Sequence, residues 1–218
     1  MIRTSLIAAA VLASSTAVAS AEFQFSAYGG WQTAPHSLVT VTGIGAESFT
    51  AGWDGRSFEM PPYWGLRGTY WLERLDMPKW GVSVDFTHAK VYADAATFPK
   101  TDNWTRFEFS DGINILTVSA MRRFDRWNGF EPYVGVGAGL SIPHVEVTRP
   151  EGTTFNYQVG GAALQAQVGA NYYINDWLSV FGEYQFNYAM NNVTLTEGAK
   201  LETNIILNAF VAGVSVHF

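Results

Sequence analysis

The C-terminal stretch Ala209-Phe210-Val211-Ala212-Gly213-Val214-Ser215-Val216-His217-Phe218 has the pattern that decides the fold. Successive side chains of an extended strand point to opposite faces. One face of this stretch therefore carries only apolar side chains, with an aromatic residue at each end, whereas the other face mixes small, polar and apolar residues. The pattern predicts a β-strand with a continuous apolar face that runs to the last residue.

The same alternation recurs along the rest of the chain. It covers residues 22–31, 80–87, 116–121, 133–142, 164–171 and 179–186, and residues 63–72 and 209–218 bring the number of strands to eight. Gly, Gln, Ser, Thr, Asp and Glu share the face opposite the apolar one, which is too polar for the dry core of a soluble, lipocalin-like barrel. Lipid outside and a polar interior require this pattern. We therefore expect an all-β fold, an eight-stranded antiparallel up-and-down transmembrane β-barrel.

The N-terminus has the pattern of a secretory signal peptide. Arg3 gives a positive start, an apolar run follows, and Ala19-Ser20-Ala21 matches the site that signal peptidase reads. We expect residues 1–21 to be the signal peptide and residues 22–218 the barrel domain. No later stretch has about 18 consecutive apolar residues, which argues against a transmembrane helix.

Composition excludes several classes of function. The 218 residues include no Cys, which rules out thiolate metal sites and cysteine nucleophiles. The formal net charge of −6 argues against a nucleic-acid partner. The glycines of the run 135–139 share one face of a strand and no helix follows, so they do not form a nicotinamide or flavin dinucleotide loop.

Connection lengths predict the orientation of the barrel. Residues 73–79, 123–131 and 174–176 form short connections, whereas residues 32–62, 92–107, 146–156 and 190–202 form long ones, which are typical of the extracellular side. Two aromatic girdles are expected, with Trp71, Trp80, Trp127 and Trp177 beside the short turns and Trp31, Trp53, Trp64 and Trp104 near the long loops. Inside the barrel we expect Arg67, Asp85 and Glu183 to pair, because buried charges need partners.

The terminal strand resembles that of bacterial outer-membrane barrels. This resemblance implies that the chain is located in the bacterial outer membrane. It also implies that the strand ending at Phe218 is the signal read by the outer-membrane assembly machinery. Barrels of this size are often monomers, and we expect a monomer here.

Two histidines fall at the extracellular ends of predicted strands. They are His88, in Asp85-Phe-Thr-His-Ala-Lys90, and His144, in Ile142-Pro-His-Val-Glu146. Both continue the lipid-facing parity of their strands, unless a bulge at Pro143 turns the second one. A histidine at headgroup height is either an interfacial amphipathic residue or a functional group that binds phosphate, binds a metal or acts in catalysis. Three basic residues at this height are candidates to bind lipid phosphates, namely Lys90, Arg67 and Arg149.

Three stretches resemble small outer-membrane barrels of alphaproteobacteria described as lipid A oxidases. They are residues 52–71, from Gly-Trp-Asp-Gly to Arg-Gly-Thr-Tyr-Trp, residues 85–92 with His88, and residues 132–146 with His144. The resemblance implies conversion of the proximal glucosamine of lipid A to 2-aminogluconate with O2, and release of hydrogen peroxide. Lipid A, within lipopolysaccharide, would then be the partner of the protein.

An O2-dependent oxidation normally needs a flavin or a redox metal, and this chain has no flavin fold. The remaining route is a metal, and imidazole suits copper and iron. The candidate catalytic residues are His88, His144, Glu146 and Asp85, with Arg67 and Lys90 as substrate-binding residues. One strand separates the two histidines, so about 10 Å lies between their backbones and only long side chains can converge. Either histidine is alternatively a general base on the anomeric hydroxyl.

A second hypothesis stays open beside the oxidase. The chain is then a non-enzymatic barrel that supports membrane integrity or passes small apolar molecules. The first hypothesis predicts an altered lipid A in cells that carry the protein. The second predicts an unchanged lipid A, with altered permeability or detergent sensitivity.

Overall fold

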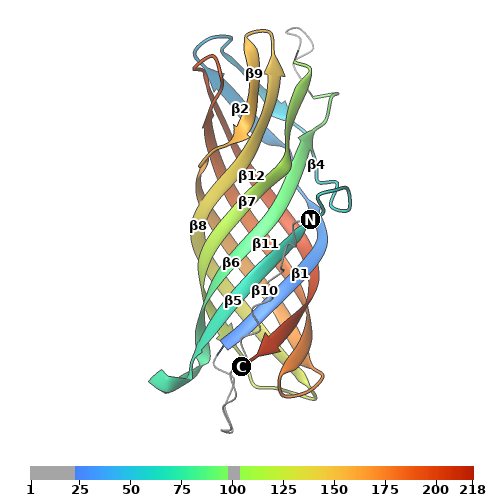
Figure 1. The fold of residues 1–218 in the computed structure, drawn as a ribbon, viewed down its shortest axis with the longest axis vertical. Coiled ribbons are helices and arrows are strands. Elements are labelled where there is room, and N and C mark those ends of the chain that lie inside the picture. Colours follow the sequence, from blue (N-terminus) through green and yellow to red (C-terminus); the bar gives the residue numbers. More distant parts are fainter. Residues whose placement is uncertain (1–22, 98–103) are drawn as a thin grey trace, which may run out of the picture.

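A computed structural model describes residues 23–97 and 104–218 of the chain, and shows a tall barrel of tilted strands (Figure 1). The predicted signal peptide lies outside the described residues. Within them, the strands are β1 (Phe23–Thr33), β2 (Ser37–Thr42), β3 (Glu47–Ala51), β4 (Trp53–Asp54), β5 (Trp64–Leu72), β6 (Met77–Ala93), β7 (Arg106–Arg123), β8 (Phe130–Arg149), β9 (Gly152–Tyr157), β10 (Gly161–Tyr173), β11 (Leu178–Thr194) and β12 (Lys200–His217), and a 3-10 turn η1 spans Glu73–Leu75. No helix in the described ranges is long and apolar enough to cross a membrane.

Eight of the strands pair in an antiparallel ring. The order is β1-β5-β6-β7-β8-β10-β11-β12, and β12 pairs back onto β1 with Gln24 opposite His217 and Thr33 opposite Asn208. Phe23 and Phe218 exchange backbone hydrogen bonds of 3.3 and 2.8 Å where this seam begins. Each of the eight predicted strands falls on one strand of the ring, although Tyr63 lies just before β5 and residue 22 lies outside the described residues. Closure pairs every strand on both sides, which removes the exposed edges that an open sheet would present.

The alternation of side chains has the predicted polarity. Val84, Val136 and Val214 are exposed on the outer surface, whereas their neighbours Ser83 and Ser215 are buried inside. The soluble, lipocalin-like alternative requires the reverse arrangement. The outer surface of the ring is therefore an apolar belt, and hydrogen-bonded polar side chains fill the interior at the level of this belt.

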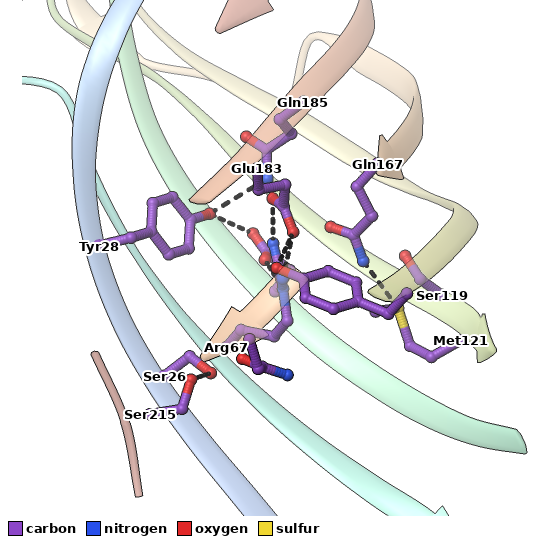
Figure 2. Close-up of polar contacts among 12 residues, drawn as sticks. Ser26, Tyr28, Arg67, Ser119, Met121, Gln167, Glu183, Gln185 and Ser215 are labelled. Carbon is purple, nitrogen blue, oxygen red and sulfur yellow. Dashed lines mark hydrogen bonds and ion pairs between the residues drawn. The ribbon is translucent and has the colours of Figure 1, made fainter. Parts of the chain in front are cut away.

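Charges inside the belt are paired. The Arg67 Nε lies 2.6 Å from Asp85 Oδ2, and its two terminal nitrogens each donate a 2.7 Å hydrogen bond to Glu183. Tyr28 donates to Asp85 and Tyr133 donates to Glu183, at 2.7 and 2.9 Å. Figure 2 shows Tyr28, Arg67 and Glu183 pointing towards one another inside the barrel. The predicted pairing of the arginine with both carboxylates is confirmed.

The long-loop end of the barrel differs from the prediction. The strands continue well past the belt, so that much of the predicted loops 146–156 and 190–202 is strand, and β2, β3 and β4 lie within the predicted loop 32–62. In the described part of the predicted loop 92–107, only residues 92–93 and 106–107 are strand. The interior there is apolar rather than polar, with Val41, Phe107, Phe109, Val147 and Leu201 among its buried residues. An apolar interior is expected where water rather than lipid surrounds the strands, because the hydrophobic effect then drives apolar side chains inward.

This change of interior also corrects the predicted girdles. Trp53 and Trp104 are buried in the apolar core of the long-loop end, and Trp71 is buried inside the belt, where its Nε1 donates to Gln24 Oε1 at 3.2 Å. The exposed tryptophans are Trp31 and Trp64 at the upper edge of the belt and Trp80, Trp127 and Trp177 at the short-turn end. Each girdle is therefore thinner than the sequence predicts.

Candidate functional site

His88 faces outward at the upper edge of the belt. The preceding Thr87 points inward, where its hydroxyl lies 2.7 Å from the Tyr28 hydroxyl, so His88 lies on the opposite face of β6. Its ring stacks on Trp64, with 5.8 Å between the ring centroids. Its Nδ1 lies 2.8 Å from Asn114 Oδ1, whereas Nε2 is buried and has no hydrogen-bond partner among the described residues. Because a carbonyl oxygen can only accept, Nδ1 carries the proton and Nε2 keeps a free lone pair.

A bulge in β7 fills the gap between the two histidines. Glu108 pairs with Glu146 and Ile113 with Pro143, so four residues of β7 stand opposite two of β8. Gly112, with φ of +116°, lies against His88, and a Cβ at this position would be 2.4 Å from the imidazole Cε1. The residues of the bulge thereby bring polar groups from β7 towards β8, which a regular strand between the histidines would not do.

His144 and Glu146 form the centre of a polar cluster with this bulge. Val145 and Val147, which alternate with them, are buried in the apolar core, so His144 and Glu146 point outward. His144 Nδ1 lies 3.0 Å from Glu146 Oε1 and 3.6 Å from Asp111 Oδ2. The outward parity of His144 is therefore retained despite Pro143.

Neighbouring groups fix this pair in place. Ser110 donates a 2.7 Å hydrogen bond to Glu146 Oε1, and Arg106 forms an ion pair with Glu146 Oε2. The rings of Phe155 and Tyr157 on β9 lie 4.6 and 4.5 Å from the His144 ring. Burial tends to raise the pKa of Glu146, but the hydrogen bonds from Ser110 and His144 and the charge of Arg106 outweigh burial and lower this pKa. Glu146 is therefore ionised at neutral pH.

The cluster contains two of the four predicted catalytic residues and adds a residue that the sequence analysis missed. His144, Glu146 and the missed Asp111 offer ligand atoms that all lie within 4.8 Å of one another. The signal for Asp111 is the Ser-Asp-Gly run 110–112, a turn-like sequence inside an otherwise regular strand. His88 lies on the other flank of the same bulge.

Two predicted site residues lie elsewhere. Asp85 and Arg67 are buried in the barrel interior as partners of one another and of Glu183, on the face of the sheet opposite His88 and His144. This placement corrects the expectation that Arg67 reaches lipid phosphates at the outer surface. It also separates Asp85 from the outward-facing group of His88, Asp111, His144 and Glu146, which we call the outward cluster. A shift of three residues along β6 reverses the face of the strand.

The other basic candidates have protein partners. Lys90 is buried, and its Nζ donates a 2.7 Å hydrogen bond to the Glu59 carbonyl. Arg149 is buried in ion pairs with Glu197 and Glu151, with 2.7 and 3.1 Å between the charged atoms. Both side chains therefore brace the long-loop end.

A cavity on the outer surface lies apart from this cluster. It has a volume of about 500 Å³ and lies between the end of β1 and residues 53–59, with Trp31, Arg56 and Phe58 in its wall. The four residues His88, Asp111, His144 and Glu146 are not part of its lining. The outward cluster, and not this cavity, combines a histidine with acids in one place.

Comparisons with known proteins agree with the architecture. The family model of the outer membrane protein beta-barrel domain matches residues 4–218. The solved structure of a Neisserial surface protein, NspA, matches with a TM-score of 0.50 at 17% identity, over 90% of this chain and 97% of that one. The outer membrane protein OprG from Pseudomonas aeruginosa matches with a TM-score of 0.53 at 14% identity, over 91% and 97% of the two chains. No curated protein matches the sequence.

Proposed function

The chain belongs to the outer membrane protein β-barrel family, and from this premise we propose that it is an enzyme of the bacterial outer membrane that oxidises lipid A. In this proposal the ring of eight strands spans the membrane as a monomer, and the long-loop end faces the outside. The substrate is the proximal glucosamine of lipid A, with its anomeric hydroxyl free, and the product is 2-aminogluconate.

The outward cluster at the upper edge of the apolar belt is the observation that carries this proposal. His88 and His144 face away from the barrel interior, and the exposed Trp31 and Trp64 mark where the apolar belt ends. Tryptophan prefers the boundary between hydrocarbon and headgroups. The headgroup sugars of outer-leaflet lipid A therefore come to the height of these histidines without leaving the membrane.

The packed interior supports a surface site over a conduit. Within the belt, Arg67 and its two acidic partners lie across the interior, and above them apolar side chains such as Phe107, Phe109 and Leu201 fill the space. A small molecule that passed through the barrel would have to displace these contacts. Lipid A reaches the outward cluster from the leaflet without displacing them.

The proposed reaction is a two-electron oxidation of a hemiacetal. The C1–H and O–H bonds break, two electrons and two protons pass to O2 to give hydrogen peroxide, and C1 becomes the carbonyl of a lactone. Water then opens the lactone to the acid, so the lipid gains one oxygen atom overall. A base is needed for the hydroxyl proton, and we assign this role to His88, whose buried Nε2 has no hydrogen-bond partner among the described residues. The sugar must displace groups that cover this nitrogen before the hydroxyl can reach it.

Electron transfer to O2 requires a redox group, because ground-state O2 reacts slowly with closed-shell sugars. The outward cluster offers the imidazole and carboxylate donors that suit iron or copper. A bound metal would supply the one-electron chemistry. The outward cluster holds the sugar at the upper edge of the belt, and His88 accepts the proton of the sugar hydroxyl.

Mass spectrometry of lipid A tests the proposal. Cells grown in air with and without the protein are compared, together with His88→Ala and the matched control His36→Ala, which changes an exposed loop histidine. We expect the wild type and His36→Ala to add one oxygen to the proximal sugar, and His88→Ala to add none although its barrel folds. The cells must contain folded wild-type protein and lipid A that lacks the 1-phosphate. If the lipid A of such cells stays unchanged, the result instead supports the non-enzymatic barrel.

A further inference from the structure

We propose that Asp111, His144 and Glu146 bind one divalent first-row transition metal. We further propose that the Arg106 guanidinium neutralises the charge of Glu146 until the metal binds. The inference deepens the proposed function, because it names the ligands of the redox group. It rests on that function only for what the metal does.

The distances suit a single ion. Two ligand atoms bound to one metal at about 2.1 Å lie about 3.0–3.4 Å apart for octahedral to tetrahedral angles. His144 Nδ1 lies 3.0 Å from Glu146 Oε1 and 3.6 Å from Asp111 Oδ2, and all three ligand atoms lie within 4.8 Å of one another. Small side-chain rotations bring such atoms to bonding distance of one ion. The ion would replace the direct contact between His144 Nδ1 and Glu146 Oε1.

Exposure differs among the three ligands in the way a catalytic site requires. The Glu146 side chain is only 1% exposed and that of His144 6%, whereas Asp111 is 52% exposed. The metal would therefore be anchored from the barrel side and open towards the outer surface. Catalytic metal sites typically have three protein ligands and keep a position for water or substrate, whereas structural sites are closed.

The local charge also favours a cation. Glu146, Asp111 and Glu108 bring three carboxylates to this face, and Arg106 contacts both Glu108 and Glu146 as ion pairs. Three carboxylates against one guanidinium leave an excess of negative charge. Glu146 Oε2 is in contact with the Arg106 guanidinium, so this oxygen can bind a metal only when the guanidinium moves away.

Arg106 is the group that metal binding must displace. Its side chain is 48% exposed, and its Nε already contacts Glu108. When a metal enters, the guanidinium can keep Glu108 and release Glu146. Removal of the guanidinium therefore takes away a competitor for Glu146, and we expect Arg106→Gln to bind the metal about tenfold more tightly.

His88 is not among the ligands of this site. Its Nδ1 is bound to Asn114, and it lies on the far flank of the bulge, against Gly112. His88→Ala should therefore bind the metal as the wild type does. This variant separates metal binding from the proposed chemistry.

Cobalt(II) titration of the refolded full-length barrel tests the proposal, with visible absorption and calorimetry as readouts. We expect one Co(II) per chain in the wild type and in Asp125→Asn, a matched control at an exposed carboxylate of the short-turn end. We expect affinity to fall at least about tenfold in Asp111→Asn and further in Glu146→Gln, because carboxylate oxygens are replaced by weaker amide donors. Asp111 is exposed, so its variant should fold even if Glu146→Gln does not.

The outcomes distinguish this site from the proposed function. Stoichiometric Co(II) binding that is lost in Asp111→Asn, with unchanged lipid A in cells, would retain the metal site and remove the oxidase. Absence of stoichiometric binding in the folded wild type, or equal affinity in Asp111→Asn and the wild type, overturns the metal site. If the oxidase acts on lipid A with all metal removed by a chelator, the proposed role of the metal in the oxidation fails and the oxidase stands.

Discussion

The buried arginine inside the belt gives the sharpest prediction about stability. Replacement of Arg67 by Met removes a guanidinium that donates three hydrogen bonds of 2.6 to 2.7 Å to Asp85 and Glu183. Both carboxylates are then buried without a positive partner. Loss of one partner from a buried ion pair costs about 3–5 kcal/mol.

Other donors to the carboxylates keep the expected loss within this range. Asp85 Oδ1 still accepts from Tyr28 and Thr87 at 2.7 and 2.9 Å, and Glu183 Oε2 accepts from Tyr133 at 2.9 Å. These bonds satisfy lone pairs but bring no charge. We therefore expect the free energy of unfolding of Arg67→Met to fall by about 3–5 kcal/mol.

Urea unfolding of the protein refolded into vesicles, followed by tryptophan fluorescence, measures this loss. Gln167→Met is the matched control, because Gln167 is buried in the same interior and its Nε2 donates to Met121 Sδ. Within the part of the chain that the structure describes, Gln167 Oε1 has no hydrogen-bond partner. We expect this control to lose less than about 1.5 kcal/mol. An additional change of both acids to amides should recover part of the loss in Arg67→Met. A loss in Arg67→Met no greater than that in the control would refute the reasoning.

Three further predictions concern the surface, the bulge and assembly. Val136→Arg places a charge on the exposed face of the belt and should cost about 2–4 kcal/mol of folding free energy in bilayers. The control Asp125→Asn, beyond the belt, should show no such loss. An equal loss in both variants would mean that Val136 does not face lipid. Gly112→Ala puts a Cβ 2.4 Å from His88 Cε1 at a φ of +116°. It should displace the imidazole and reduce lipid A oxidation at least about tenfold while the barrel still folds, and full activity would contradict the role of His88. Phe218→Ser should slow assembly in cells without slowing refolding of the purified chain, whereas normal assembly would show that the terminal aromatic residue is not the signal.

The ring itself is predictable from the sequence because its environment is simple. Lipid outside and polar groups inside impose one rule on every residue of the belt, and alternations such as those of residues 80–87 and 209–218 follow it. The ion pairs of Arg67 follow from the same rule, because a charge on the inner face needs a partner there. The period-two pattern therefore predicts the ring, the polarity of its two faces and the pairing of its interior charges.

The long-loop end escapes this rule because lipid no longer surrounds it. Val145 and Val147 alternate with Glu146 in the same way as belt residues do, but here the apolar side points inward. The sequence pattern of a strand does not show where the surroundings change from lipid to water. For the same reason Trp53 and Trp104 were predicted in a girdle and are buried in a core.

The candidate site was partly predictable. His88, His144 and Glu146 were found from their height and parity on the strands. Asp111 was not, because its place depends on a bulge that shifts the pairing of β7 against β8. Asp85 is near His88 in sequence, but the two are three residues apart, and this odd spacing puts Asp85 on the opposite face of β6.

Incubation of the purified barrel with lipid A that lacks the 1-phosphate, under O2, tests the central claim most directly. Product mass and hydrogen peroxide are measured together, with the protein loaded with Fe(II) or Cu(II). The account predicts one oxygen gained by the proximal sugar and one hydrogen peroxide released for each lipid converted, and no conversion by His88→Ala. A folded, metal-loaded wild type that leaves this lipid unchanged would contradict the account.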